Sequence, residues 1–226
     1  MLTRVLLFDA GNTIIELDYA ALAAICTRHG AAVNAATMEE AVVRIRPELD
    51  EFMRTPSSST ESTDTREFML RSVYARLGID REKQAPITGE ILAVLQSLWS
   101  HPTRGAGMTL TALHKRGHVL GVVSNSDGTV DQQIEQSGLA HHFEVIVDSG
   151  TVGVEKPDPE IFAIALRALQ AHAAEATYFG DMPSVDVVGA LRAGIAPVLI
   201  DPLDLFPDVT CRRIHNLPDL LADRSG

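Results

Sequence analysis

Residues 5–13 read VLLFDAGNT, which is four apolar residues followed directly by an acid and a turn. A continuous apolar run is typical of a strand that is buried on both faces of a parallel sheet. Similar short runs recur further along the chain, at Val119–Val123, Val145–Val147, Tyr178–Phe179 and Pro197–Ile200. The sequence therefore predicts a parallel sheet whose first strand is Val5–Phe8.

Helical patterns separate the later runs. They end in glycine at Gly117, Gly138 and Gly194, and glycine is the residue that most readily adopts the left-handed conformation that ends a helix. A further helix is expected to begin with Asp158 as N-cap and Pro159 in its first turn. Helix and strand thus alternate from about residue 105 onward, so we expect an α/β fold, a Rossmann-like doubly wound parallel sheet.

The segment 16–100 interrupts this pattern, because it holds no convincing strand. It shows helical periodicity instead, as where Tyr19, Leu22 and Ile25 share one face. We therefore expect two domains, a core made of 1–15 and 101–226 and a helical domain over 16–100.

Charge and composition exclude several classes of protein. The 226 residues carry a formal net charge of -11, which disfavours binding to nucleic acid. Every apolar run is too short for a secretion signal or a membrane span. Cys26 and Cys211 stand far apart, which gives no reason to propose a zinc site or a disulfide. The expectation is a cytoplasmic protein without membrane or nucleic-acid partners.

Three acids stand at or near predicted strand ends. Asp9 and Asp181 each follow an apolar run directly, and Asp186 stands five residues beyond the second. A buried carboxylate needs a compensating partner, and ligands of open α/β sheets bind at the carboxyl ends of the strands. Asp9 and Asp181 could therefore converge on a hard cation such as Mg²⁺. The residues alone leave the alternatives that Asp9 caps a turn and that Asp186 lies on a helix surface.

Two further segments could bind an anion. Ser124 and Asn125 end another apolar run and would offer a hydroxyl and free backbone N–H groups. The alternative is a plain turn in which Ser126 or Asp127 caps the next helix. Lys156 is one of only three lysines, and a cation there could neutralise both a phosphate and a nearby carboxylate; otherwise it is a surface lysine.

In their order and placement these residues resemble the four motifs of the haloacid dehalogenase superfamily. Those motifs are an Asp after the first strand, a Ser or Thr after the second, a Lys before a helix, and an acidic Gly-Asp-x-x-x-x-Asp. Here they are matched by Asp9, Ser124, Lys156 and Gly180–Asp186. The resemblance spans residues 4 to about 201, and the helical segment is similar to the small C1-type cap that selects the substrate in this superfamily.

The resemblance implies that Asp9 is a nucleophile that attacks phosphorus and forms an aspartyl-phosphate. It also implies a Mg²⁺ cofactor, held by Asp9, Asp181 and the backbone carbonyl of Gly11. Asp186 would act as an outer ligand of the Mg²⁺ or orient Lys156.

The resemblance further implies that Ser124, the backbone N–H of Asn125 and Lys156 bind the phosphoryl oxygens. The expected function is Mg²⁺-dependent hydrolysis of a small phosphomonoester or acyl phosphate. The expected partner is a small phosphorylated metabolite, and the expected state is a monomer or homodimer.

Gly11 departs from the phosphatase pattern of this superfamily, which usually has a second Asp two residues after the nucleophile. That Asp protonates the leaving oxygen, and acid–base catalysis of this kind contributes about 10²- to 10⁴-fold. A slow phosphatase, or one that uses a different acid, is therefore expected. Two alternatives stay open: a dehalogenase or phosphonatase-like enzyme that cleaves a carbon–halogen or carbon–phosphorus bond, and a catalytically degenerate module that binds a phosphorylated ligand or a protein.

Overall fold

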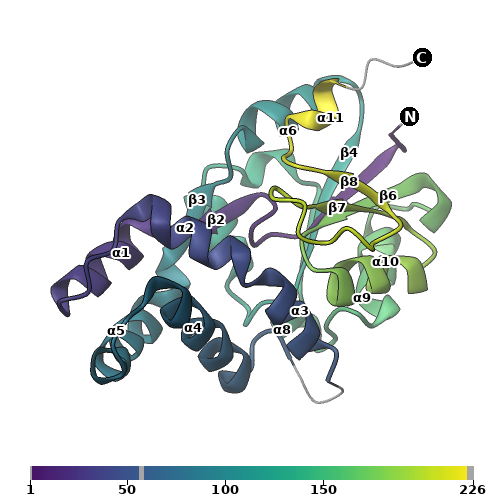
Figure 1. Cartoon of the computed structure of the whole chain (residues 1–226). Helices are drawn as coiled ribbons and strands as arrows, with labels where there is room; N and C mark the ends of the chain where they lie inside the picture. The colour runs from purple at the N-terminus through teal and green to yellow at the C-terminus, as the bar shows by residue number, and fades with distance from the viewer. Residues whose placement is uncertain (1, 56–58, 223–226) are drawn as a thin grey trace. The chain divides into compact units, whose positions relative to one another are not determined.

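The computed structural model describes residues 2–55 and 59–222. The chain forms two compact units, one over residues 1–16 and 100–226 and the other over 17–99. The first unit contains the sheet, and the second is built of helices (Figure 1).

The sheet of the first unit has six strands among the described residues, in the order β5-β4-β1-β6-β7-β8, and every neighbouring pair is parallel. Strand β1 lies between β4 and β6, with Phe8 opposite Val122 on one side and Phe179 on the other. The strands are β1 Val5–Phe8, β4 Val119–Ser124, β5 Val145–Asp148, β6 Ala176–Gly180, β7 Ala196–Ile200 and β8 Arg212–Ile214. The predicted parallel sheet is thus confirmed, while the short edge strand β8 was not predicted.

Helices cover both faces of this sheet, with α6 and α11 on one side and α9 and α10 on the other (Figure 1). Side chains on alternate positions of β1 point to opposite faces, and all four residues of the strand are buried. The α-helices are α6 Ala106–Lys115, α7 Val130–Gln136, α8 Ser149–Val152, α9 Pro159–Ala168, α10 Val188–Arg192 and α11 Asp219–Ala222. Short turns are η1 Ala140–His142, η2 Ala173–Glu175 and the π-helical η3 Pro183–Val187. This doubly wound α/β architecture is the predicted one.

Two helix starts show what the sequence could and could not predict. Helix α9 begins as predicted, because the carboxylate of Asp158 accepts a hydrogen bond from the N–H of Glu160. The alternative that Ser126 or Asp127 caps α7 is wrong, because the helix has no side-chain cap of its own. The carboxylate of Asp148, at the end of β5, takes the place of a local cap by accepting from the N–H groups of Gly128 and Val130, both at 3.1 Å.

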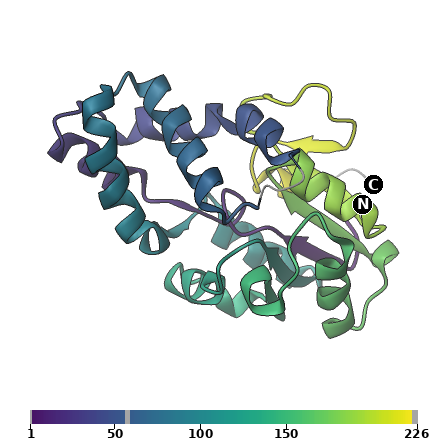
Figure 2. The same cartoon turned by 90° about the horizontal axis from the view of Figure 1, so that it is seen from below.

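The second unit is a group of packed helices, drawn in purple to blue-green in Figure 2. They are α1 Tyr19–Arg28, α2 Ala35–Arg44, α3 Arg46–Met53, α4 Thr63–Leu77 and α5 Arg81–Leu98. Leu22 and Ile25 of the predicted apolar face are buried in one core with Val73 and Ile87. Burial of this shared apolar face is what holds such short helices together.

Two strands that the sequence did not reveal, β2 Ile15–Leu17 and β3 Trp99–Pro102, pair in a separate two-stranded sheet where the chain passes between the units. Across residues 2–55 and 59–222, no helix combines the length and the apolar character needed to cross a membrane.

Candidate active site

Three neighbouring strands, β4, β1 and β6, bring polar side chains to one edge of the sheet. Asp9 directly follows β1, Ser124 ends β4, and Asp181 directly follows β6. Because the three strands are parallel and in register, their carboxyl ends meet at this edge. Asp9, Ser124 and Asp181 are all buried, so the sheet itself sets their positions.

Lys156 connects the acids of this edge. Its Nζ lies 2.6 Å from Oδ1 of Asp9 and 2.8 Å from Oδ1 of Asp186, and the Lys156 side chain is only 3% exposed. Lys156 is therefore not a surface lysine. One ammonium group serves two buried carboxylates, which is an arrangement that compensates much of the cost of taking those charges out of water.

The electrostatics of Asp9 and Lys156 follow from burial and from each other. Burial raises the pKa of Asp9 to about 7, the nearby ammonium opposes this rise, and the charges of Asp186 and Asp181 add to it. Burial also lowers the pKa of Lys156, but the attraction of Asp186 and Asp9 outweighs it and places the Lys156 pKa above its ordinary value. Lys156 is thus a permanent cation beside a carboxylate that changes charge near neutral pH.

Asp186 folds back onto the end of β6 from the turn η3. Its Oδ2 accepts from the N–H groups of Asp181 and Met182, at 3.0 and 2.9 Å, while its Oδ1 faces Lys156. A Cβ at Gly180 would collide with the Asp186 carboxylate, so the glycine is needed for this close approach. Asp186 is buried in the cluster rather than placed on a helix surface.

Asn125 holds the backbone of Lys156. Its side-chain oxygen accepts from the Lys156 N–H at 2.7 Å, and its amide donates to the Lys156 carbonyl at 3.0 Å. The hydroxyl of Ser124 lies 3.4 Å from the Asn125 carbonyl. The sequence-predicted pair Ser124 and Asn125 therefore lies beside the loop that carries Lys156, and Gly11 lies in the turn after Asp9.

The hydrophobic pattern does not reveal Tyr178 as a site residue, because it stands in the apolar run Tyr178–Phe179. Its hydroxyl lies 2.8 Å from Nζ of Lys156 and 3.1 Å from Oδ1 of Asp186. Burial, followed by the charges of Asp186 and Asp9, raises the pKa of Tyr178 well above its ordinary value, so the phenol is neutral. A hydroxyl at the tip of a residue in an apolar run is the signal that could have revealed it.

The residues present fit a divalent cation. Asp9, Asp181 and Asp186 each offer one carboxylate oxygen, these atoms lie within 4.8 Å of one another, and all three residues are buried. Two buried oxygens in the loop after β1, Oδ1 of Asn12 and Oγ1 of Thr13, have no hydrogen-bond partner among the described residues. A site whose donors are all oxygens, with three carboxylates to one ammonium, suits a hard cation such as Mg²⁺.

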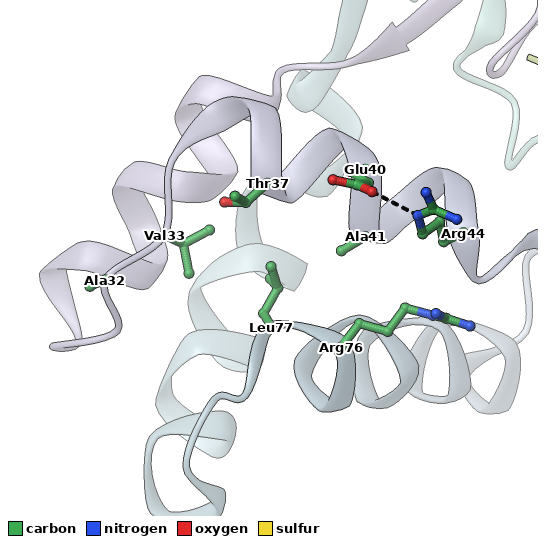
Figure 3. Close-up of a pocket in the computed structure, with 8 residues that line it drawn as sticks. All are labelled: Ala32, Val33, Thr37, Glu40, Ala41, Arg44, Arg76 and Leu77. Atoms are coloured by element: carbon green, nitrogen blue, oxygen red, sulfur yellow. Dashed lines mark hydrogen bonds and ion pairs between the residues drawn. The ribbon is translucent and has the colours of Figure 1, made fainter. Parts of the chain in front are cut away.

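A pocket of about 490 Å³ lies within the helical unit, between α2 and α4 (Figure 3). Arg44 and Arg76 lie at the same end of it. Each already has a carboxylate partner, because Arg44 pairs with Glu40 at 2.8 Å and Arg76 pairs with Glu48. The pocket lining contains no acid–base or nucleophilic cluster, so the chemistry of the molecule is better sought at the sheet edge.

Comparison with known proteins shows which family the chain resembles. The profile of a family described as haloacid dehalogenase-like hydrolase matches residues 49–200 of the chain. Haloacid dehalogenase-like hydrolase domain-containing protein 3 of Mus musculus is 29% identical over 230 residues, which cover 96% of this chain and 90% of that protein.

Two further similarities point to different reactions. Phosphoserine phosphatase of Thermus thermophilus is 42% identical over 95 residues, covering 41% of this chain and 37% of that enzyme. The crystal structure of 2-haloacid dehalogenase from Pseudomonas syringae is 26% identical, with a TM-score of 0.60 and complete coverage of both chains. The names of these two proteins refer to different reactions, so the likeness alone does not choose between them.

Proposed function

The chain belongs to the haloacid dehalogenase-like hydrolases, and we propose that it hydrolyses a small phosphomonoester or acyl phosphate through an aspartyl-phosphate on Asp9. The observation that carries this proposal is the buried cluster of Asp9, Asp181 and Asp186 around Lys156. A carboxylate beside a fixed cation, at the carboxyl edge of a parallel sheet, is suited to nucleophilic attack on an anionic group.

Asp9 performs the covalent chemistry in this proposal. A carboxylate oxygen of Asp9 attacks phosphorus, and the bond between phosphorus and the leaving oxygen breaks, so the leaving group departs with the electron pair. Water then attacks the same phosphorus, which releases inorganic phosphate and restores the Asp9 carboxylate. Lys156 offsets the negative charge on Asp9 and on the transferring group throughout.

Other residues at this edge of the sheet would bind the phosphoryl group and the metal, or orient Lys156. The hydroxyl of Ser124 and the backbone N–H of Asn125 would donate hydrogen bonds to the phosphoryl oxygens. The Asn125 side chain would hold the loop of Lys156 in place. Asp9, Asp181 and the Gly11 carbonyl would hold Mg²⁺, and when bound it would screen the phosphoryl charge from the acids. Both oxygens of Asp186 already face hydrogen-bond donors of the protein, so we assign Asp186 to orienting Lys156.

Further parts of the proposal concern the whole protein. The helical unit would act as the cap that selects a small phosphorylated metabolite. We propose that the protein works in the cytoplasm as a monomer or homodimer, without nucleic-acid or membrane partners; the net charge of -11 supports the exclusion of nucleic acid.

The test is release of inorganic phosphate from a panel of phosphomonoesters and acetyl phosphate, with Mg²⁺ and with EDTA. Wild type should release phosphate only with Mg²⁺, and Asp9→Asn should abolish release. Asp201→Asn is the matched control, because Asp201 is also a buried acid directly after a strand. Its carboxylate instead accepts from the N–H groups of Leu205 and Phe206 and pairs with Arg213. Loss of activity in both variants, or none in Asp9→Asn, would contradict the proposal.

A second candidate function is displacement of halide from a 2-haloacid, in which Asp9 attacks carbon instead. The similarity to 2-haloacid dehalogenase over the complete chain favours it, whereas the acidic cluster favours a metal-assisted phosphate reaction. Halide release from 2-chloropropionate that persists in EDTA, with no phosphate release from any ester, would establish this second function. Release of neither product would favour a phospho-ligand or protein binding module.

A further inference from the structure

Tyr178 places a hydroxyl among the charged side chains from the middle of strand β6. The residue is fully buried, and its ring meets that of Phe162 edge-on with the centroids 4.9 Å apart. A phenylalanine ring would fill the same space between the sheet and α9. Core packing therefore accounts for the ring of Tyr178 but not for its hydroxyl.

The hydroxyl connects three parts of the site. It lies 2.8 Å from Nζ of Lys156, 3.1 Å from Oδ1 of Asp186 and 2.9 Å from the carbonyl oxygen of Val123. A phenol has one hydrogen, so it accepts from the ammonium while it donates to either the carboxylate or the carbonyl. Val123 immediately precedes Ser124, so the hydroxyl also ties Lys156 to the end of β4.

The ammonium of Lys156 has three N–H groups, and the structure offers it three acceptors. These are Oδ1 of Asp9 at 2.6 Å, Oδ1 of Asp186 at 2.8 Å and the Tyr178 hydroxyl at 2.8 Å. With all three directions occupied, the orientation of the ammonium is fixed. Removal of the hydroxyl would leave one buried N–H unpaired, which is costly for a charged donor.

We propose that Tyr178 is a positioning residue whose hydroxyl holds the third N–H of Lys156 and so directs the ammonium at Asp9. The inference rests on the proposed function, in which Asp9 is the nucleophile and Lys156 offsets its charge. The hydroxyl acts through Lys156 and does not touch the reacting phosphorus.

The test compares Tyr178→Phe with Tyr74→Phe. Tyr74 is a buried tyrosine of α4 whose hydroxyl lies 2.9 Å from Oγ1 of Thr88, so each variant loses one bonded hydroxyl and keeps its ring. Only Lys83, Lys115 and Lys156 contribute ammonium signals to a spectrum of ¹⁵N-lysine-labelled protein. Loss of one signal in Lys156→Arg assigns it, and hydrogen exchange of that ammonium is then measured in EDTA.

The same variants are compared for single-turnover formation of the aspartyl-phosphate and for KM, with Mg²⁺ present. Tyr178→Phe should speed exchange of the Lys156 ammonium and slow aspartyl-phosphate formation, each by about 10-fold or more, because a hydrogen bond to a charged group is lost. KM should change by less than about 3-fold, since the affected group acts on the chemical step. Tyr74→Phe should resemble wild type in every measurement.

Exchange and single-turnover rates in Tyr178→Phe that equal those of Tyr74→Phe would overturn the proposal. So would a wild-type Lys156 ammonium that exchanges as fast as that of the exposed Lys115, and this measurement does not depend on any variant folding. If wild type forms no aspartyl-phosphate from any substrate, the proposed function fails, while the exchange rates still decide whether Tyr178 positions Lys156.

Discussion

Nζ of Lys156 lies 2.6 Å from Oδ1 of Asp9, and both side chains are almost completely buried. The same ammonium also serves Asp186, and Asp181 stands within the same cluster. One positive charge thus faces three carboxyl groups in a region of low dielectric constant, where a further proton or cation is strongly favoured. The stability and the activity of the protein should therefore both respond to changes in these charges.

Asp9→Asn should stabilise the fold more at pH 8 than at pH 5 when EDTA is present. Burial raises the pKa of Asp9 from 3.8 to about 7, so the folded protein binds this proton more tightly than the unfolded chain does. Protonation of Asp9 therefore stabilises the folded wild-type protein. This stabilisation is complete below about pH 4 and is lost as pH rises through 7. Asparagine lacks this titration. Thermal unfolding at the two pH values measures the difference, and an equal gain in Tm at both would contradict the raised pKa.

Lys156→Met should destabilise the protein by about 3–5 kcal/mol at pH 8 in EDTA, because Asp9 and Asp186 would remain buried without their cation. The loss should be smaller at pH 5, where Asp9 takes up a proton. Urea unfolding at both pH values gives the free energies. Lys115→Met changes an exposed lysine of α6 and should alter stability by less than about 0.5 kcal/mol; an equal effect in the two variants would refute this account.

Substrates whose leaving group departs without taking up a proton should react fastest, because Gly11 provides no side chain for acid catalysis. We expect kcat/KM for acetyl phosphate to exceed that for alkyl phosphates, by about 10²-fold or more. Gly11→Asp should narrow this difference by speeding the alkyl esters alone. Steady-state phosphate release with both substrate classes measures it, and similar rates for both classes in wild type would show that another group supplies the proton.

Asn125→Ala should loosen the loop of Lys156, because the side chain makes hydrogen bonds to both the N–H and the carbonyl of that residue. The expected loss of unfolding free energy is about 1–3 kcal/mol, and phosphate release should also fall. Urea unfolding provides the measurement. The control is Gln136→Ala, which removes an exposed amide at the end of α7. Wild-type stability in Asn125→Ala would mean that the loop does not depend on this contact.

The sequence was sufficient to predict five of the six strands of the sheet and the acids that follow two of them, because both depend on local patterns. Apolar runs marked the strands, and an acid directly after such a run, as at Asp9 and Asp181, marked the edge where parallel strands end. The resemblance to a known superfamily then linked Lys156 to these acids, although 147 positions separate it from Asp9.

The remainder depends on contacts that no local pattern encodes. The hydroxyl of Tyr178 was hidden in an apolar run, and its importance comes from meeting Lys156 and Asp186. Asp148 also follows an apolar run, but its carboxylate accepts hydrogen bonds from the N–H groups of Gly128 and Val130 at the start of α7. Such bonds depend on where the strands lie in space. Strand β8 is only three residues long and has two arginines, so the hydrophobic pattern gave no sign of it.

The central position of β1 has a consequence for how the protein is made. Val5 pairs with Val119 on one side and with Ala176 on the other, so the strand that precedes Asp9 is synthesised long before either of its neighbours. Contacts this distant along the chain are slow to form. A nascent chain that has not yet produced β6 leaves one edge of β1 unpaired and lacks Asp181 and Asp186 altogether. The cluster of Asp9, Asp181 and Asp186 therefore cannot form until the chain has been synthesised as far as Asp186.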